Sequence, residues 1–339
     1  MEFLGLTADT LRSPAMLFFL LGLIASICKS DLRFPESLTQ SLGLYLVLAI
    51  GFKGGVELTR HDIGANAFLL ISMGVAFSFL APFLIYTVIP LFMKSIQRVD
   101  RIAISAHYGS VSLVTFIAAT SFLDAQNIPY EGYLVILLTL METPAILSSL
   151  VMYARSEKQI EPQFTESQLS DKITAIERKP FAYHLRHVFF AGSSFLLIGS
   201  FVVGFLSGGK GAVMMYGFLN APFQGILALF LLDMGMVSGR QLLTTQDYNR
   251  KLLALGLFLP LLLGIIGLLA GTMLGLELGD KTLFAMLCGG ASYIVVPAAM
   301  RMTMPEANHG LSITLALGIT FPFNIIFGIP LFYSLARLI

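Results

Sequence analysis

Long apolar stretches, separated by short polar ones, make up most of this 339-residue chain. A helix that crosses a bilayer needs about 20 consecutive, mainly apolar residues. By this measure the pattern predicts ten spans, at residues 13–28, 39–57, 66–92, 102–123, 131–153, 188–206, 220–238, 252–275, 282–300 and 310–335. We therefore expect an all-α polytopic membrane protein with ten transmembrane helices.

One long polar stretch, residues 155–187, lies between the fifth and sixth spans. It reads as a linker, because polar clusters between apolar segments are typical of loops. The chain thus divides into a first five-helix unit (residues 1–154), the linker (155–187) and a second five-helix unit (188–339).

Two of the predicted spans are copies of one another. Residues 100–120 read DRIAISAHYGSVSLVTFIAAT, and residues 280–300 read DKTLFAMLCGGASYIVVPAAM. The alignment pairs Asp100 with Asp280, Gly109 with Gly289 and Ser112 with Ser292. Two further matches keep the same order: AIGFKGGVEL (49–58) with DMGMVSGRQL (233–242), and METPAIL (141–147) with ITFPFNI (319–325). Because each unit has an odd number of spans, the second enters the membrane from the opposite side, and we expect a 5+5 inverted repeat.

The middle of each copy is rich in small and hydroxylated residues, around Gly109 and Gly289. An interrupted helix leaves backbone N–H groups unpaired, so in a membrane it persists only where it is buried in protein or lines a cavity. Interruptions at corresponding places in two halves are typical of a transporter's binding site. We therefore expect helices four and nine to be discontinuous.

The composition and the distribution of charge agree with a membrane location. The chain is 56% hydrophobic and 12% charged, against about 25% charged in soluble domains. The net charge of +1 and the scattered basic residues argue against nucleic acid as a partner, and membrane lipid is the expected surrounding. With the N-terminus outside, most Lys and Arg residues lie in the inside loops, as the positive-inside rule requires. We expect a multi-pass plasma-membrane protein with both termini outside and a cytoplasmic linker.

The two interruptions suggest a site for a small anion. A helix that begins after each break offers unpaired N–H groups and a partial positive charge at its N-terminus, and an inverted repeat would bring two such ends together near the middle of the membrane. The expected substrate-binding residues are Gly109, Ser110, Val111, Ser112, Gly289, Gly290, Ala291 and Ser292. The alternative is that these small residues merely allow close helix packing.

An anion accumulates against an inside-negative potential only with help, since each charge costs about 2.3 kcal/mol per 100 mV. A coupled sodium ion supplies that help, and sodium is a hard cation that favours oxygen ligands. Glu142 is a carboxylate inside the fifth span, where burial is costly. The oxygens expected to bind sodium belong to Thr139, Glu142, Thr143, Thr320 and Asn324. The alternative is a protonated Glu142 that is hydrogen-bonded within the bundle.

Four more residues are candidates for coupling or gating. Asp233 is a second carboxylate within a span, and it could pair with Lys53, bind a cation or carry a proton. Tyr108 and Tyr293 flank the two breaks, where they could gate the site or simply fill space. We interpret His107, beside the first break, as a packed and hydrogen-bonded residue rather than a ligand.

Several motifs resemble the SbtA-type sodium-dependent bicarbonate transporters of bacteria. They are GSVSLVTFIAA (109–119), METPAIL (141–147), DMGM (233–236) and GIPLF (328–332). The resemblance implies ten helices in a 5+5 inverted arrangement, core and gate domains that move against each other, a homotrimer in the bacterial inner membrane, and sodium-coupled bicarbonate uptake. By motif match, Ser112 and Thr115 would carry over as anion-site or sodium-site residues, and Glu142 would replace an aspartate of the family.

The chain departs from the family pattern at two places. In the ninth span it has GGASYIVVP, so that Tyr293 stands where the family has an aspartate. The linker is also shorter than in family members that bind a PII-like regulatory protein, which makes such a partner a weak expectation.

The function expected from these observations is a sodium-coupled symporter that imports bicarbonate or a similar small anion by alternating access. The alternative is a sodium–organic-anion symporter or a cation–proton antiporter on the same scaffold. The sequence carries no HExxH or GxGD motif, so we do not expect an enzyme.

Overall fold

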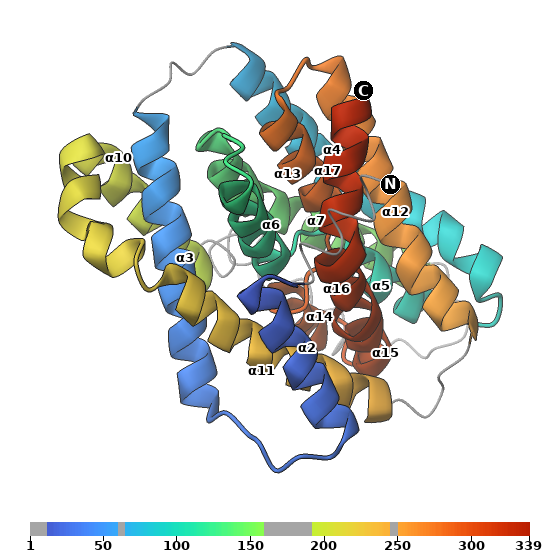
Figure 1. Cartoon of the computed structure of the whole chain (residues 1–339). Helices are drawn as coiled ribbons and strands as arrows, with labels where there is room; N and C mark the ends of the chain where they lie inside the picture. Colours follow the sequence, from blue (N-terminus) through green and yellow to red (C-terminus); the bar gives the residue numbers. More distant parts are fainter. Residues whose placement is uncertain (1–11, 60–64, 159–191, 245–249) are drawn as a thin grey trace.

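The computed structural model describes residues 12–59, 65–158, 192–244 and 250–339, and within these ranges the chain forms helices and connecting loops without any strand (Figure 1). The amino-terminal elements are α2 (Pro14–Ile27), α3 (Glu36–Leu58), α4 (Ala65–Phe92), α5 (Arg98–Gly109), α6 (Leu113–Ala125) and α7 (Tyr133–Lys158). The carboxy-terminal elements are α10 (Gly192–Leu219), α11 (Phe223–Thr244), α12 (Arg250–Met273), α13 (Leu278–Cys288), α14 (Val295–Thr303), α15 (His309–Ile313), η2 (Thr314–Thr320), α16 (Phe321–Phe323), η3 (Asn324–Gly328) and α17 (Ile329–Leu338).

Among the described residues, eight helical segments are long and apolar enough to cross a membrane. The segment Arg98–Ala125, which contains α5 and α6, is one of them, and the rod His309–Leu338 is another. The first and ninth predicted spans are not among the eight. Pro14–Ile27 is a shorter apolar helix, and the ninth predicted span is divided between α13 and α14.

The linker and the sixth span differ from their predicted limits. Helix α7 continues to Lys158, past the predicted start of the linker at residue 155; residues 159–187 of that linker lie outside the described part. The sixth span was predicted to end at residue 206, but α10 continues to Leu219. The chain turns within α10 at Gly208, whose φ of 56° favours glycine. Gly208 thus forms a kink between two helical stretches.

The last thirty residues form one helical rod that contains two wide π-helical stretches, η2 and η3. Pro322 lies between them in α16. Proline has no N–H group and its ring crowds the preceding turn, which explains the local widening. Such wide turns are frequent at functional sites because they redirect side chains and free carbonyl groups.

Glycine residues set the spacing of two helix pairs, α3 with α10 and α2 with α11. A Cβ atom at Gly55 of α3 would collide with the main-chain oxygen of Phe201 in α10. A Cβ atom at Gly22 of α2 would collide in the same way with the oxygen of Leu232 in α11. Helices approach this closely only where small residues face each other. Figure 1 shows α10 beside α3 on one side of the molecule.

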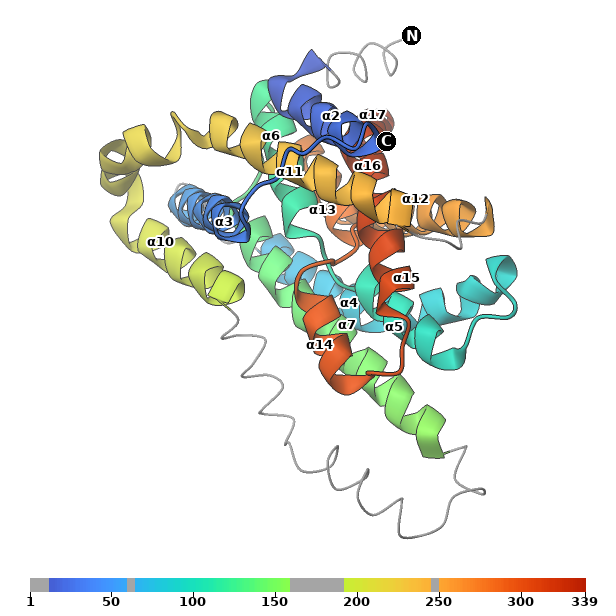
Figure 2. The same cartoon turned by 90° about the horizontal axis from the view of Figure 1, so that it is seen from below.

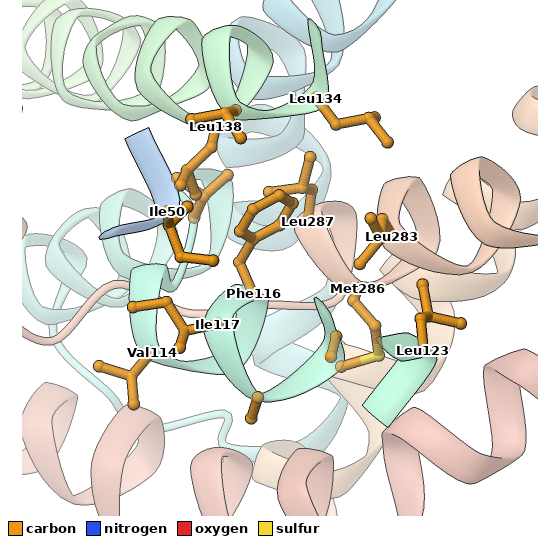
Figure 3. Packing of buried hydrophobic residues seen from close by; sticks show 14 of the residues in the cluster. Ile50, Val114, Phe116, Ile117, Leu123, Leu134, Leu138, Leu283, Met286 and Leu287 are labelled. Atoms are coloured by element: carbon orange, nitrogen blue, oxygen red, sulfur yellow. The ribbon is translucent and has the colours of Figure 1, made fainter. Parts of the chain in front are cut away.

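Helix α6 occupies the centre of the structure. All its residues from Val114 to Leu123 are buried, as expected for a helix that is apolar on every side. Figure 3 shows Phe116 and Ile117 of α6 packed among Ile50 of α3, Leu138 of α7 and Leu287 of α13. The helix is therefore fixed by neighbours from both halves of the chain.

Two aspartates at the start of the broken spans hold distant loops. Asp100 in α5 accepts a hydrogen bond at Oδ1 from the main-chain N–H of Asn308 (2.7 Å). Asp280 in α13 accepts one at Oδ1 from the N–H of Glu131 (2.8 Å). Asp100 thus fixes the loop before the last helical rod, His309–Leu338, and Asp280 fixes the loop before α7.

Candidate functional site

The predicted interruptions near Gly109 and Gly289 are both present. Helix α5 ends at Gly109, α6 begins at Leu113, and Ser110 and Ser112 between them have extended main-chain angles. Helix α13 ends at Cys288, and α14 begins at Val295. Figure 2 shows α5 and α14 on the same side of the molecule, with α6 and α13 above them.

The two unwound segments touch each other. The N–H of Ser292 donates to the main-chain oxygen of His107 (2.8 Å), and Nδ1 of His107 lies 2.7 Å from the main-chain oxygen of Ser292. A Cβ atom at Gly290 would lie 3.0 Å from the main-chain nitrogen of Ser112. The sequence therefore places its two interruptions in direct contact, although 180 residues separate them.

A proline from a neighbouring helix lies against the start of each break. A Cβ atom at Gly109 would lie 2.5 Å from Cγ of Pro82 in α4. A Cβ atom at Gly289 would lie 2.8 Å from the main-chain oxygen of Pro260 in α12. Both glycines are therefore required by close approach at equivalent positions of the two breaks.

The prediction that the amides of Ser110 and Ser292 are unpaired is wrong. The N–H of Ser110 donates to the oxygen of Ala106 (3.3 Å), and that of Ser292 donates to His107. The helix after the second break also begins later than expected, at Val295. The physical reason is that the second segment takes its hydrogen-bond partner from the first segment, and so stays non-helical until Val295.

The remaining predicted anion-site residues are buried around the same contact. Ser112 caps α6, since its Oγ accepts from the N–H (3.3 Å) and from the hydroxyl (2.8 Å) of Thr115. Ser110 donates through Oγ to the main-chain oxygen of Glu142 (3.3 Å). Val111 and Ala291 are buried and offer only main-chain groups here.

The predicted sodium-site residues lie on both sides of the breaks. Glu142 adjoins the first break through its main-chain oxygen. Asn324 adjoins the second, where its Nδ2 donates to the oxygen of Gly289 (2.9 Å). The other amide atom of Asn324, Oδ1, is fully buried and has no partner among the described residues. A buried carbonyl oxygen without a donor is costly, and a cation is one ligand that would satisfy it.

Three threonines of the sodium-site prediction have different surroundings. Thr320 donates through Oγ1 to the oxygen of Gly256 (2.7 Å) and lies 2.6 Å from the hydroxyl of Tyr108. Thr139 donates to the oxygen of Val135 one turn earlier in α7 (3.3 Å). Thr143, in the same helix, is buried.

Asp233 and Lys53 have separate neighbours in this structure. Asp233 is buried in α11 and accepts a hydrogen bond at Oδ2 from the hydroxyl of Thr39 (2.6 Å). The ammonium of Lys53 lies over the ring of Phe223, 4.3 Å from its centre, and is attracted by the carboxylate of Asp124. The sequence allowed a pairing of Asp233 with Lys53. In the structure the hydrogen-bond partner of Asp233 is Thr39, a residue that the sequence did not single out.

The two tyrosines beside the breaks differ in their environment. Tyr108 is completely buried, with its hydroxyl on Thr320. Tyr293 packs edge-on against Phe321, with 5.3 Å between ring centres. Its buried hydroxyl lies near Ser112 without a hydrogen bond of ordinary geometry among the described residues. The Tyr293 hydroxyl is thus a second unsatisfied polar atom at the meeting point of the breaks.

A cavity of about 1050 Å³ opens beside the end of α6. Its polar lining includes Lys53 and Glu57 of α3, Asp124 of α6, and Tyr130 of the loop that follows. Burial, and secondly the nearby Asp124 carboxylate, raises the pKa of Tyr130, which therefore stays a neutral hydrogen-bonding group. A second cavity, of about 900 Å³ and mainly apolar, lies between α2, α6 and α11. Neither of these two cavities is lined by the residues of the breaks.

The interpretation of His107 as a packed and hydrogen-bonded residue is confirmed. Sequence reasoning missed its partner, Ser292, and did not single out Thr39 or Asp124. The repeat identified both breaks, but it gave no sign that a side chain of one break would bind the main chain of the other. Asp124 ends α6 and faces Lys53 from another helix, so only the folded structure shows that the two are neighbours.

The number and apolar character of these helices define a multi-pass membrane protein. Crossing interruptions of this kind are typical of transporters. The sequence pattern of the Na+-dependent bicarbonate transporter superfamily matches residues 14–337. The chain therefore belongs to this superfamily, which confirms the resemblance in the motifs, and the family implies Na+-dependent bicarbonate transport. Comparison with curated proteins gives no match.

Proposed function

We propose that this protein is a sodium-coupled symporter that imports bicarbonate, or a similar small anion, by alternating access. The observation that carries the proposal is the contact between the two unwound segments inside a member of the Na+-dependent bicarbonate transporter superfamily. Interrupted helices that meet within a membrane protein place main-chain donors and acceptors where ions can bind.

A 5+5 inverted repeat is part of the proposal, and reciprocal contacts support it. Asp100 holds a loop of the second half, while Asp280 holds a loop of the first. Gly109 meets Pro82 as Gly289 meets Pro260. The pairing of α3 with α10 has its counterpart in the pairing of α2 with α11. In each case one contact occurs twice, once at each of two corresponding positions, as an inverted repeat requires.

We assign α2, α3, α10 and α11 to a gate domain and the other helices to a core domain that carries the breaks. Helix α6 of the core and α11 of the gate are joined by a hydrogen bond between Ser121 and Gln224 (3.0 Å). The cavities beside α6 have lining residues from both groups of helices. Movement of the core along this boundary would expose the breaks to one side of the membrane and then to the other.

In this proposal the N-termini of α6 and α14 attract the anion. A helix N-terminus carries about half a positive charge, and its effect is strong where water is excluded. The hydroxyl of Tyr293, which lies near Ser112 and has no hydrogen-bond partner of ordinary geometry in the described part of the chain, supplies a further donor for the anion. Sodium would bind on the Asn324 side, where Oδ1 is unsatisfied, with Thr115, Thr139, Glu142, Thr143 and Thr320 as the remaining proposed oxygens.

We further propose that the protein lies in the bacterial inner membrane, with both termini outside and lipid against its exposed apolar side chains. These side chains include Phe68, Leu91, Leu206, Met214 and Met273. The homotrimer and the PII-like regulator stay predictions from the resemblance.

Sodium-driven uptake of labelled bicarbonate is the direct test. In proteoliposomes at alkaline pH, where little carbon dioxide is present, we expect an inward sodium gradient to raise the initial rate about ten-fold or more over a potassium gradient. The reason is that downhill sodium entry offsets the cost of moving an anion inward against a negative interior. Equal rates in the two gradients would reject coupling. Unlabelled nitrate and a bulky carboxylate, added as competitors, distinguish a small-anion site from an organic-anion site.

Replacing Ser112 with alanine tests the anion site. We expect the apparent KM for bicarbonate to rise about five-fold, because a helix cap contributes about 1 kcal/mol and its loss loosens the first turn of α6. Initial uptake rates over a range of bicarbonate concentrations give the KM. Ser334→Ala is the control, since the hydroxyl of Ser334 donates to the oxygen of Pro330 in its own helix near the carboxy-terminus. If Ser112→Ala and Ser292→Ala both keep the wild-type KM, the two hydroxyls do not belong to the site.

A further inference from the structure

His107 satisfies both main-chain groups of one residue in the second break. Its main-chain oxygen accepts from the N–H of Ser292 (2.8 Å), and its ring nitrogen Nδ1 bonds to the oxygen of Ser292 (2.7 Å). Buried main-chain groups outside regular structure need such partners. His107 provides the pair from the end of α5, on the opposite half of the chain.

The partner fixes the form of the imidazole. A carbonyl oxygen can only accept, so the hydrogen of the neutral ring must be on Nδ1, and Nε2 is left with a lone pair. The side chain is completely buried, and Nε2 has no partner among the described residues. The described interaction therefore uses one side of the ring, Nδ1, and leaves Nε2 unoccupied.

Two side chains hold the carbonyl groups of the second break. Asn324 donates to the oxygen of Gly289 at its beginning, and His107 donates to the oxygen of Ser292 three residues later. Gly290 and Ala291 lie between these two points. Both belong to the anion-binding residues expected from the sequence, and the direction in which their amides point depends on both attachments.

The geometry points to His107 as a positioning residue that holds residues 289–292 in the shape that binds the anion. This inference rests on the proposed function, because it concerns the same site. The imidazole need not touch the substrate. It acts through Ser292, and loss of the Nδ1 hydrogen bond releases the segment and leaves a buried carbonyl without a donor.

Replacing His107 with asparagine, glutamine or leucine distinguishes a specific hydrogen bond at Nδ1 from simple packing. Asparagine at position 107 places an N–H donor close to the position of Nδ1, whereas glutamine places one near Nε2, and leucine has none. We expect His107→Asn to keep the apparent KM for bicarbonate within about three-fold of wild type. His107→Leu and His107→Gln should raise it about ten-fold or more, since an unsatisfied buried carbonyl costs about 1–3 kcal/mol.

Hydrogen–deuterium exchange measures the attachment itself and does not depend on transport. Peptides that cover residues 286–296 should exchange about ten-fold faster in His107→Leu than in wild type or in His107→Asn. His309→Leu is the matched control, because the ring nitrogens of His309 make no hydrogen bond among the described residues; it should match wild type in both measurements. Size-exclusion chromatography of each variant establishes that it is folded.

The outcomes separate the inference from the proposed function. If the wild type shows no sodium-driven uptake, the proposed function fails, while the exchange experiment still decides whether His107 holds the segment. Faster exchange with an unchanged KM in His107→Leu would overturn the positioning role. Equal impairment of transport by Asn and by Leu at position 107 would also overturn it, because the donor at Nδ1 would then be irrelevant.

Discussion

Replacing Asn324 with leucine is expected to weaken the apparent affinity for sodium in bicarbonate uptake about 100-fold, so that uptake is retained only at very high sodium concentrations. The substitution removes the donor to the oxygen of Gly289 and the unsatisfied Oδ1 at the same time. Loss of groups around a metal ion typically reduces its affinity 10- to 100-fold, and the buried carbonyl of Gly289 adds about 1–3 kcal/mol of destabilisation. The measurement is the initial uptake rate as a function of sodium concentration.

Asn220→Leu is the matched control for this experiment, because Asn220 is an exposed asparagine at the end of α10. It should transport like the wild type. An additional variant, Asn324→Asp, retains acceptor oxygens but cannot donate to Gly289. Uptake by Asn324→Leu with the sodium dependence of the wild type would exclude Asn324 from the sodium site.

Replacing Gly55 with alanine should destabilise the protein by about 3 kcal/mol, which is at the upper end of the range for overpacking. The added methyl group collides with the main chain of α10 at Phe201, so no change of side-chain conformation relieves it. The two helices must separate along their whole contact. Thermal unfolding in detergent, followed by loss of the helical signal, measures the effect.

Gly199→Ala in α10 is the control for this prediction. Nothing lies within 4 Å of a Cβ atom at Gly199, and alanine is the better helix former by roughly 0.5–1 kcal/mol. This variant should be as stable as the wild type or slightly more so. A Gly55→Ala protein that unfolds at the wild-type temperature would show that the contact between α3 and α10 is looser than the structure indicates.

The membrane-spanning helices were predictable because their signal is local. An apolar stretch of sufficient length has few other stable arrangements, and the limits predicted for α4 and α12 differ from the observed ones by at most two residues. The two breaks were predictable for another reason: the same pattern occurs twice, which points to a shared role. Signals of this kind depend on neighbours in the sequence or on repetition.

The contacts between the breaks were not predictable, because they join residues that are far apart in the chain. The assignment of Ser292 as a free donor was wrong for this reason, since its partner is His107. Asp233 likewise has Thr39 beside it, a residue with no distinctive sequence context. The extension of α10 past Gly208 was missed because local composition favours a turn there, whereas the helix resumes after the kink.

The reciprocal aspartate caps bear on how this architecture arises. Neither of the two proposed five-helix units contains the carboxylate that closes the loop before its own last helix; Asn308 depends on Asp100, and Glu131 depends on Asp280. On the proposed inverted repeat, a single ancestral unit would have had an open loop until it met a second copy in the opposite orientation. Duplication and fusion of the gene would then have made permanent a partnership that two separate chains had already needed.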